Sequence, residues 1–278
     1  MDAMQLTAPA KLNLSLRVLG RREDGFHEID SVMVQLPELA DTLVVETASM
    51  DVLECDDPGV PTGSDNLVWR AAKVWREASG CDDPVSVQLS KQIPHGAGLG
   101  GGSSDAAAML RGLNDSFGAP LGDDELIRLA AQIGSDVAFF LGDAVGRVTG
   151  RGEILASGPE IASLPVVLLK PGFGVSTPSA YRAWRQAVAI PGIDYGEQRV
   201  GDLIIVNDLE RPVFAKHRFL AEVKRWLNLQ PGVEAGFMSG SGSTMVGVLR
   251  DLSFADDLIM RAREELDPHF WTWSGFTA

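Results

Sequence analysis

Residues 94–108 read Pro-His-Gly-Ala-Gly-Leu-Gly-Gly-Gly-Ser-Ser-Asp-Ala-Ala-Ala, and this segment decides the fold. Its glycines let the backbone adopt positive φ and approach a ligand without an intervening Cβ. Apolar residues alternate over 85–89, as in a strand, and recur every three or four positions over 106–117, as in a helix. A helix N-terminus offers unpaired N–H groups and the positive end of a dipole. Strand, glycine loop and helix in this order therefore predict a phosphate site rather than a flexible surface loop.

The composition sets bounds on domain number and on partners. With 278 residues, of which 45% are hydrophobic, the chain is long enough for a large core in one or two domains. A net charge of -14 argues against nucleic acid as a partner but leaves an anionic small ligand possible. The sequence has no apolar run long enough for a membrane helix and no signal peptide at its start, which predicts a cytoplasmic protein. Its two cysteines and four histidines match no disulfide framework or metal motif.

Hydrophobic periodicity predicts that strands and helices alternate along the chain. We therefore expect an α+β fold in which strands and helices form two layers (an α/β two-layer arrangement). In the first part we expect strands at 5–18, 29–36 and 42–47 and helices at 66–79, 106–117 and 123–133. In the second part we expect strands at 166–169, at 270–273 and, in two pieces, over 233–249. We expect helices after Ser176 and at 217–229. A third helix should follow a capping box formed by Ser253 and Asp256 and end at 266. The sequence changes character near residue 157. This predicts an N-terminal domain with the glycine loop over 1–157 and a C-terminal α+β domain over 158–278.

The glycine loop fits more than one phosphate chemistry. Gly96-x-Gly98-x-x-Gly101 formally matches the dinucleotide fingerprint, but it lies a third of the way along the chain. The acidic residue expected about 20 positions later falls between two helices instead of after a strand. Walker, protein-kinase and nucleophile-elbow motifs are absent from the sequence. What remains is a loop ending in Ser103-Ser104, which can wrap nucleotide phosphates and direct a hydroxyl at the β/γ oxygens or at Mg²⁺.

Two other segments carry groups that phosphoryl transfer needs. The acceptor hydroxyl must be held in line, a group must orient or deprotonate it, and positive charge must stabilise the transition state. Gly134-Ser-Asp136-Val137 supplies a carboxylate, and Pro9-Ala-Lys11-Leu-Asn13 places a lysine and an asparagine on one face of a strand. Taken alone, Asp136 is equally well a carboxylate at a helix N-terminus and Lys11 a charge at a strand edge, so the residues by themselves leave both readings open.

Three segments together resemble the motifs of the GHMP small-molecule kinases, in order and at similar spacing. They are Pro9-Ala-Lys-Leu-Asn13, residues 94–104 and Ser239-Gly-Ser-Gly242. Gly20-Arg-Arg-Glu-Asp-Gly-Phe-His27 is similar to a signature of the branch that phosphorylates a cytidine diphosphate-linked methylerythritol. The resemblance implies a two-domain fold with the active site in the interdomain cleft, ATP as donor with Mg²⁺, and transfer to the 2-hydroxyl of that polyol in non-mevalonate isoprenoid synthesis.

The resemblance also assigns catalytic and ATP-binding roles. Lys11 and Asp136 would be the catalytic pair, with Asn13 as a nearby hydrogen-bonding group. Because an adjacent ammonium group stabilises the carboxylate, we expect Asp136 to orient the hydroxyl and to accept its proton late. The ATP side would consist of Asn66, Lys91, Gly96, Gly98, Gly100, Gly101, Gly102, Ser103 and Ser104.

On the substrate side, the resemblance implies that Phe26 and Tyr181 sandwich the cytosine. His27 would hydrogen-bond the edge of the base, and Thr177 would line the pocket. Phe26 stands where the family often has Tyr; stacking survives that difference, whereas a phenol hydrogen bond does not. The turn over 239–243 would have a supporting role near the substrate.

Two alternatives remain at this point. A sibling kinase of the homoserine or mevalonate type would share the glycine loop but would not need the Asp24-Gly-Phe-His27 turn together with Tyr181. A nucleotide-binding sensor without chemistry would not need Lys11 and Asp136.

Overall fold

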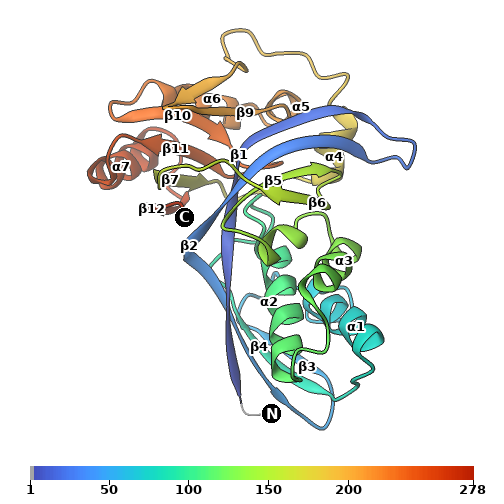
Figure 1. Ribbon diagram of the computed structural model, residues 1–278. Helices are drawn as coiled ribbons and strands as arrows, with labels where there is room; N and C mark the ends of the chain where they lie inside the picture. Colours follow the sequence, from blue (N-terminus) through green and yellow to red (C-terminus); the bar gives the residue numbers. More distant parts are fainter. Residues whose placement is uncertain (1–2) are drawn as a thin grey trace.

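A computed structural model describes residues 3–278 and divides them into two lobes joined by a long hairpin (Figure 1). The hairpin consists of β1 (Met4–Arg21) and β2 (His27–Thr47), which pair antiparallel along their whole length. We predicted two strands at 29–36 and 42–47, but they are one strand. The partner of β1 shifts from Ala40 at Pro9 to Leu36 at Ala10, so residues 37–39 bulge out of the ladder. Proline at position 37, within this bulge, lacks the N–H that ladder pairing needs.

The hairpin is the centre of the larger sheet, whose strands run in the order β3-β4-β2-β1-β9-β8, with β5 and β6 continuing from β2. The other strands are β3 (Val52–Cys55), β4 (Val85–Ser90), β5 (Val145–Gly150), β6 (Ile154–Ser157), β8 (Gln198–Val200) and β9 (Leu203–Asn207). Strand β9 pairs parallel with β1, with Ser15 opposite Val206 and Leu16 opposite Asn207. The polypeptide beyond residue 157 therefore returns to the sheet of the first half, so the two halves share backbone hydrogen bonds.

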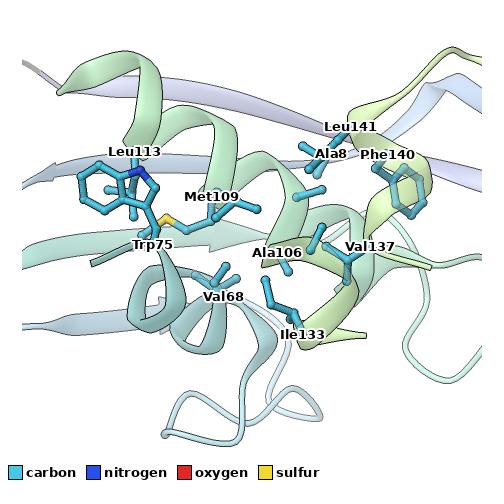
Figure 2. Packing of buried hydrophobic residues seen from close by; sticks show 14 of the residues in the cluster. Ala8, Val68, Trp75, Ala106, Met109, Leu113, Ile133, Val137, Phe140 and Leu141 are labelled. Atoms are coloured by element: carbon cyan, nitrogen blue, oxygen red, sulfur yellow. The ribbon is translucent and has the colours of Figure 1, made fainter. Parts of the chain in front are cut away.

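Three helices and a 3₁₀ turn pack on the lower part of this sheet: α1 (Leu67–Ser79), α2 (Gly101–Ser116), α3 (Asp123–Ile133) and η1 (Ala138–Leu141). The predicted ends of α1 are confirmed, since Asn66 caps its first turn and Gly80 follows it in the left-handed conformation. Trp75, Met109 and Leu113 are buried in the core that these elements enclose (Figure 2). This packing fixes the N-terminal end of α2, which carries the second half of the glycine loop.

The second lobe is built on a smaller antiparallel sheet with the order β10-β11-β7-β12. Its elements are β7 (Pro165–Lys170), α4 (Thr177–Ala183), α5 (Glu210–Lys216), α6 (Arg218–Asn228), β10 (Val233–Met238), β11 (Met245–Leu249), η2 (Leu252–Phe254), α7 (Ala255–Glu265) and β12 (Trp271–Phe276). The predicted capping box is wrong: α7 begins at Ala255, and Asp251 accepts a 2.8 Å hydrogen bond from the Ser253 amide ahead of it. Of the helices formed within residues 3–278, none combines the length and apolar character that crossing a bilayer requires.

Candidate active site

A cleft of about 720 Å³ lies where the glycine loop, the β1–β2 hairpin and α4 meet. Both halves of the chain line it, among others through Lys11, Phe26, Asp136, Thr177, Tyr181 and Ser241. The hairpin runs past α4, and its tip projects beyond that helix (Figure 1). Phe26 immediately before β2 and Tyr181 of α4, which are distant in sequence, both line the cleft. The glycine loop and the aromatic residues Phe26 and Tyr181 line this same cleft.

The glycine loop is held between β1 and the turn over 239–243. The Lys11 amide donates to the Leu99 carbonyl at 2.9 Å, and the Ser239 hydroxyl donates to the Gly98 carbonyl at 3.1 Å. Gly98 has φ of 80°, and a Cβ there would lie 2.4 Å from the Ser239 carbonyl oxygen. A Cβ at Gly100, with φ of 75°, would lie 2.9 Å from Lys11 Cγ. Both positions therefore require glycine by conformation and by space.

The loop runs directly into the N-terminus of α2. Gly100 is the residue that caps this helix, and Gly101, Gly102 and Ser103 line the cleft as its first residues. The amides of a first helical turn have no acceptor within the helix, and the helix dipole places positive charge there. This end of the cleft therefore suits the phosphates of a nucleotide.

Lys11 and Asp136 lie next to this helix end. Lys11 Nζ is 3.3 Å from Asp136 Oδ2, with the lysine side chain 4% exposed and the aspartate side chain 30% exposed. Lys11 Nζ also donates to Asn13 Oδ1, and Asn13 Nδ2 donates to the Ser31 hydroxyl at 2.9 Å. The lysine is thus fixed from behind by a hydrogen-bonded chain, while the carboxylate keeps a face open to the cleft.

Aromatic rings gather at the other end of the cleft. The His27 ring lies 5.3 Å from that of Tyr181 and edge-on to Trp184 at 6.1 Å. Phe26 is 50% exposed, and the Arg151 guanidinium lies 5.0 Å from its ring centroid. Burial lowers the pKa of His27, so near neutral pH the imidazole is uncharged and has one donor and one acceptor nitrogen. In this structure the Tyr181 ring contacts His27 and not Phe26, so a base held by Phe26 and Tyr181 would have to enter beside the imidazole.

Thr177 and Tyr181 connect the two ends of the cleft. Thr177 Oγ1 lies 2.7 Å from Ser241 Oγ, which joins the start of α4 to the turn over 239–243. Burial, and to a lesser degree the Asp136 carboxylate, raise the pKa of the Tyr181 phenol, so the phenol stays protonated. The aromatic end and the Lys11–Asp136 pair are therefore parts of one continuous site.

Two family models match the chain, the GHMP kinases N terminal domain over residues 66–143 and the GHMP kinases C terminal model over residues 198–267. The 4-diphosphocytidyl-2-C-methyl-D-erythritol kinase of Methylacidiphilum infernorum is 39% identical over 277 residues, 95% of this chain and 93% of that protein. The kinase of the same name from Geobacter sp. strain M21 is 39% identical over 90% of this chain and 91% of that protein. This chain belongs to that family of GHMP kinases.

Solved structures agree with this assignment. A crystal structure of 4-(cytidine 5'-diphospho)-2C-methyl-D-erythritol kinase matches with a TM-score of 0.77 and 36% identity, covering 99% of each chain. Homoserine kinase from Cytophaga hutchinsonii has a TM-score of 0.69 at 16% identity, over 100% of this chain and 95% of that one, which shows a shared fold. The α+β GHMP kinase fold is therefore confirmed, and the chain is a small-molecule kinase.

Lys91 of this kinase is not a free cation on the ATP side. Its side chain is 6% exposed, and its ammonium group lies between two side-chain oxygens, Asp105 Oδ2 at 2.7 Å and Asp41 Oδ2. Asp41 Oδ1 in turn accepts from the amides of Gln92 and Ile93, at 2.6 and 2.8 Å. The sequence suggested Lys91 as a cation for ATP. In the structure it ties the entry of the glycine loop to helix α2, although it also lines the cleft.

The buried carboxyl group of Asp105 gives this kinase a pH dependence of stability. Burial raises the pKa of Asp105 to about 7 from a usual value of 3.8. The folded state therefore binds more protons than the unfolded state between these values, so this group's contribution to the free energy of unfolding falls as pH rises through that window. We expect Asp105→Asn to remove this decline, and urea unfolding at a series of pH values between 4 and 8 measures it. The exposed Asp115→Asn on the same helix is the control; an equal change in both variants would contradict the prediction.

Of two further residues predicted for the ATP side, Ser104 lies away from the cleft and Asn66 lies in its wall. Asn66 lines the cleft, but its Oδ1 caps α1 at the Val68 amide and its Nδ2 donates to the Pro61 carbonyl. Ser104 does not line the cleft; it faces a smaller cavity of about 150 Å³ on the other side of α2, with its hydroxyl buried and unpartnered among the described residues. Helix geometry explains the difference, since adjacent residues point about 100° apart and only Ser103 can face the cleft.

Sequence reasoning missed Arg151 as a cleft residue, together with Asp41 and Asp105 beside Lys91. Ser241 belongs to the turn over 239–243, which was predicted to lie near the substrate. Arg151 lies between Gly150 and Gly152 in the turn from β5 to β6, and its flanking glycines were the available sign of a close approach. Within residues 3–278, no group of three or more His, Cys, Asp or Glu side chains is arranged to hold a metal ion.

Proposed function

We propose that this kinase transfers the γ-phosphoryl group of ATP to the 2-hydroxyl of 4-diphosphocytidyl-2-C-methyl-D-erythritol, an intermediate of the non-mevalonate route to isoprenoid precursors. The Lys11–Asp136 pair carries the proposal: it lies 3.3 Å apart, between a helix N-terminus suited to phosphate and a group of aromatic rings suited to a base. The names of the curated relatives supply the substrate.

In the proposed reaction, the glycine loop and the first amides of α2 hold the triphosphate. Asp136 accepts a hydrogen bond from the 2-hydroxyl and takes its proton as the oxygen–phosphorus bond forms. The bond between the γ-phosphorus and the β–γ bridging oxygen breaks in the same step, and ADP leaves. Lys11, fixed by Asn13, holds the carboxylate and stabilises the charge on the transferred group. Ser103, which lines the cleft at the start of α2, would help to hold a Mg²⁺ ion, which would neutralise part of the negative charge of the phosphates.

The cytidine end binds by stacking and by hydrogen bonds in this proposal. Phe26 and Tyr181 present ring faces to the cytosine, and the uncharged His27 bonds to its edge. Stacking is tolerant of the Phe26 side chain in place of tyrosine, since both rings offer the same face. Thr177 and Ser241 then lie near the polyol, between the base and the Lys11–Asp136 pair.

Substrate identity is tested by incubating the purified kinase with ATP, Mg²⁺ and 4-diphosphocytidyl-2-C-methyl-D-erythritol, with homoserine and mevalonate as the competing acceptors. We expect a new phosphomonoester from the cytidine substrate alone, and inhibition by free cytidine diphosphate. Phosphorylation of homoserine or mevalonate instead would assign the chain to a sibling activity, and ATP binding without any transfer would indicate a sensor.

Phe26→Ala is expected to weaken binding of the cytidine substrate and to leave binding of ATP unchanged. A stacked base is worth about 1–3 kcal/mol, so the KM for this substrate should rise about tenfold while kcat and the KM for ATP stay nearly unchanged. Steady-state kinetics with both substrates varied measures kcat and the two KM values separately. Phe26→Tyr serves as the control that keeps the aromatic ring. A fall in kcat with an unchanged KM would place Phe26 outside the base site.

A further inference from the structure

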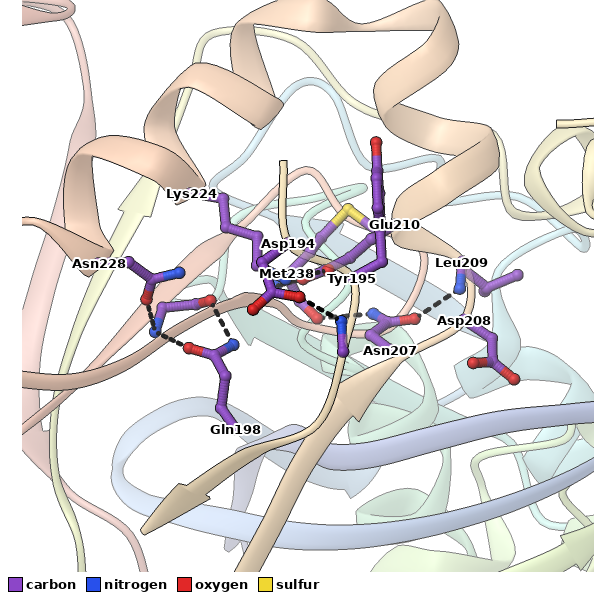
Figure 3. A network of polar contacts seen from close by, with 12 residues as sticks. Asp194, Tyr195, Gln198, Asn207, Asp208, Leu209, Glu210, Lys224, Asn228 and Met238 are labelled. Carbon is purple, nitrogen blue, oxygen red and sulfur yellow. Dashed lines mark hydrogen bonds and ion pairs between the residues drawn. The ribbon is translucent and has the colours of Figure 1, made fainter. Parts of the chain in front are cut away.

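Asn207 is a buried side chain at the end of β9 whose hydrogen bonds all go to backbone atoms. It is 3% exposed. Its Nδ2 donates to the carbonyl oxygens of Met238 and Gly240, both at 2.7 Å, and its Oδ1 accepts from the Leu209 amide at 2.9 Å (Figure 3). One donor hydrogen of the amide thus bonds to the last residue of β10, Met238, and the other bonds to Gly240 in the turn that follows.

The turn that Asn207 holds, residues 239–243, is part of the wall of the cleft. Gly240 and Ser241 line the cleft. A Cβ at Gly240 would lie 3.1 Å from Asn13 Oδ1 and 3.4 Å from Lys11 Nζ. The same turn contacts the glycine loop, because the Ser239 hydroxyl donates to the Gly98 carbonyl. A shift of this turn therefore changes the space around the Lys11 ammonium group and the position of the loop together.

The segment that carries Asn207 is itself held by contacts with other elements. Asn207 lies opposite Leu16 on β1, the strand that carries Lys11. Three residues later, the buried Glu210 pairs with Lys224 Nζ, and Glu210 Oε1 accepts from the Met238 amide at 3.0 Å (Figure 3). The segment 207–210 thus holds the start of the turn from two sides and is tied to the strand of the catalytic lysine.

We propose that Asn207 is a positioning residue for phosphoryl transfer, which sets the turn over 239–243 against Lys11, Asn13 and the glycine loop. The inference rests on the proposed function. Asn207 touches neither Lys11 nor Asp136 and acts through Met238 and Gly240. Reacting groups must be placed within a fraction of an ångström for efficient transfer, so loosening this turn lowers the chemical rate more than it weakens substrate binding.

Asn207→Asp is the sharpest test. The change keeps an oxygen that can accept from the Leu209 amide, but it replaces the donor of two hydrogen bonds by an oxygen facing two carbonyl oxygens. We expect kcat to fall by about tenfold or more, with the KM for the cytidine substrate nearly unchanged. Lowering the pH should restore part of kcat relative to wild type, because a protonated carboxyl group can again donate one hydrogen bond.

Gln198→Glu is the matched control. Gln198 also uses its amide on β10, donating to the Gly236 carbonyl at 2.9 Å and accepting from the Gly236 amide at 3.1 Å, but it does so away from the turn. A purely structural role for such an amide predicts the same loss in both variants. We expect Gln198→Glu to lower the melting temperature and to keep kcat close to that of the wild type.

Gly240→Ala provides a second variant in case Asn207→Asp does not fold. Gly240 has φ of 55°, and an added Cβ would contact Asn13 and Lys11 on the cleft side of the turn. The substitution should therefore displace the turn and give the same selective loss of kcat. An unchanged kcat in either folded variant, or an equal fall in Gln198→Glu, would overturn the inference. Absence of transfer by the wild-type kinase would overturn the proposed function instead, so the two failures are distinguishable.

Discussion

Replacing Asp136 by Asn lowers kcat by about a hundredfold or more, while the dissociation constants for ATP and the cytidine substrate change little. The amide cannot accept the proton of the acceptor hydroxyl, although it can still form a hydrogen bond with it. Lys11 loses the partner 3.3 Å away but keeps Asn13, so the lysine should stay in place. Single-turnover kinetics, together with calorimetric titration of both ligands, separates the chemical step from binding.

Asp143→Asn is a matched control for this experiment. Asp143 is exposed, lies outside the cleft and bonds only to the Ser157 hydroxyl, at 3.3 Å, among the contacts of residues 3–278. It should behave as wild type in every assay. A kcat for Asp136→Asn within about threefold of wild type would remove the carboxylate from the chemistry.

Gly98→Ala is expected to lower kcat/KM for ATP by about two orders of magnitude. A non-glycine residue at φ of 80° costs about 1–2 kcal/mol. In addition, the new Cβ would lie 2.4 Å from the Ser239 carbonyl oxygen and 3.0 Å from that of Gly242. Because both contacts are with backbone atoms, the glycine loop and the turn over 239–243 must move apart, and the phosphate-binding amides move with them.

Gly118→Ala separates the cost of the backbone conformation from the effect of the Cβ contact. Gly118 has φ of 82°, but an added Cβ there would have no heavy atom within 4 Å. This variant should lose stability through the backbone conformation alone and should keep its kinetics. If Gly98→Ala bound and used ATP as well as Gly118→Ala does, the contact between the loop and the turn would not matter for nucleotide binding.

Local features of the fold could be predicted from the sequence because their causes are local. The caps of α1, namely Asn66 and Gly80, and the helix after the glycine loop follow from residue preferences over a few positions. The short strands β5, β6, β8 and β9 were missed because each has only three to six residues, too few for a clear alternation. In addition, β5 and β9 pair with β2 and β1, which lie far away in the sequence. The continuity of β2 was missed because a bulge at residues 37–39 breaks the alternation that marks a strand.

Contacts between residues far apart in the sequence were equally hard to predict in the candidate site. The spacing of Lys11 and Asp136 does not reveal that they meet; the resemblance to known kinases supplied that pairing, and the structure brings their charged atoms within 3.3 Å. The partners of Lys91 lie 50 and 14 positions away, so its burial between two carboxylates has no local sign. Likewise, the residues of Ser103-Ser104 are chemically equal in sequence, and only the phase of α2 decides which hydroxyl faces the cleft.

The most direct test of the central claim is to locate the phosphate on the product. Wild-type kinase is incubated with ATP, Mg²⁺ and 4-diphosphocytidyl-2-C-methyl-D-erythritol labelled with ¹³C in the polyol, and carbon–phosphorus couplings are measured by NMR. We expect a phosphomonoester on the 2-hydroxyl, formed by the wild type and by Asp143→Asn but only at a trace rate by Asp136→Asn. A phosphate on another hydroxyl, or equal rates in all three proteins, would contradict it.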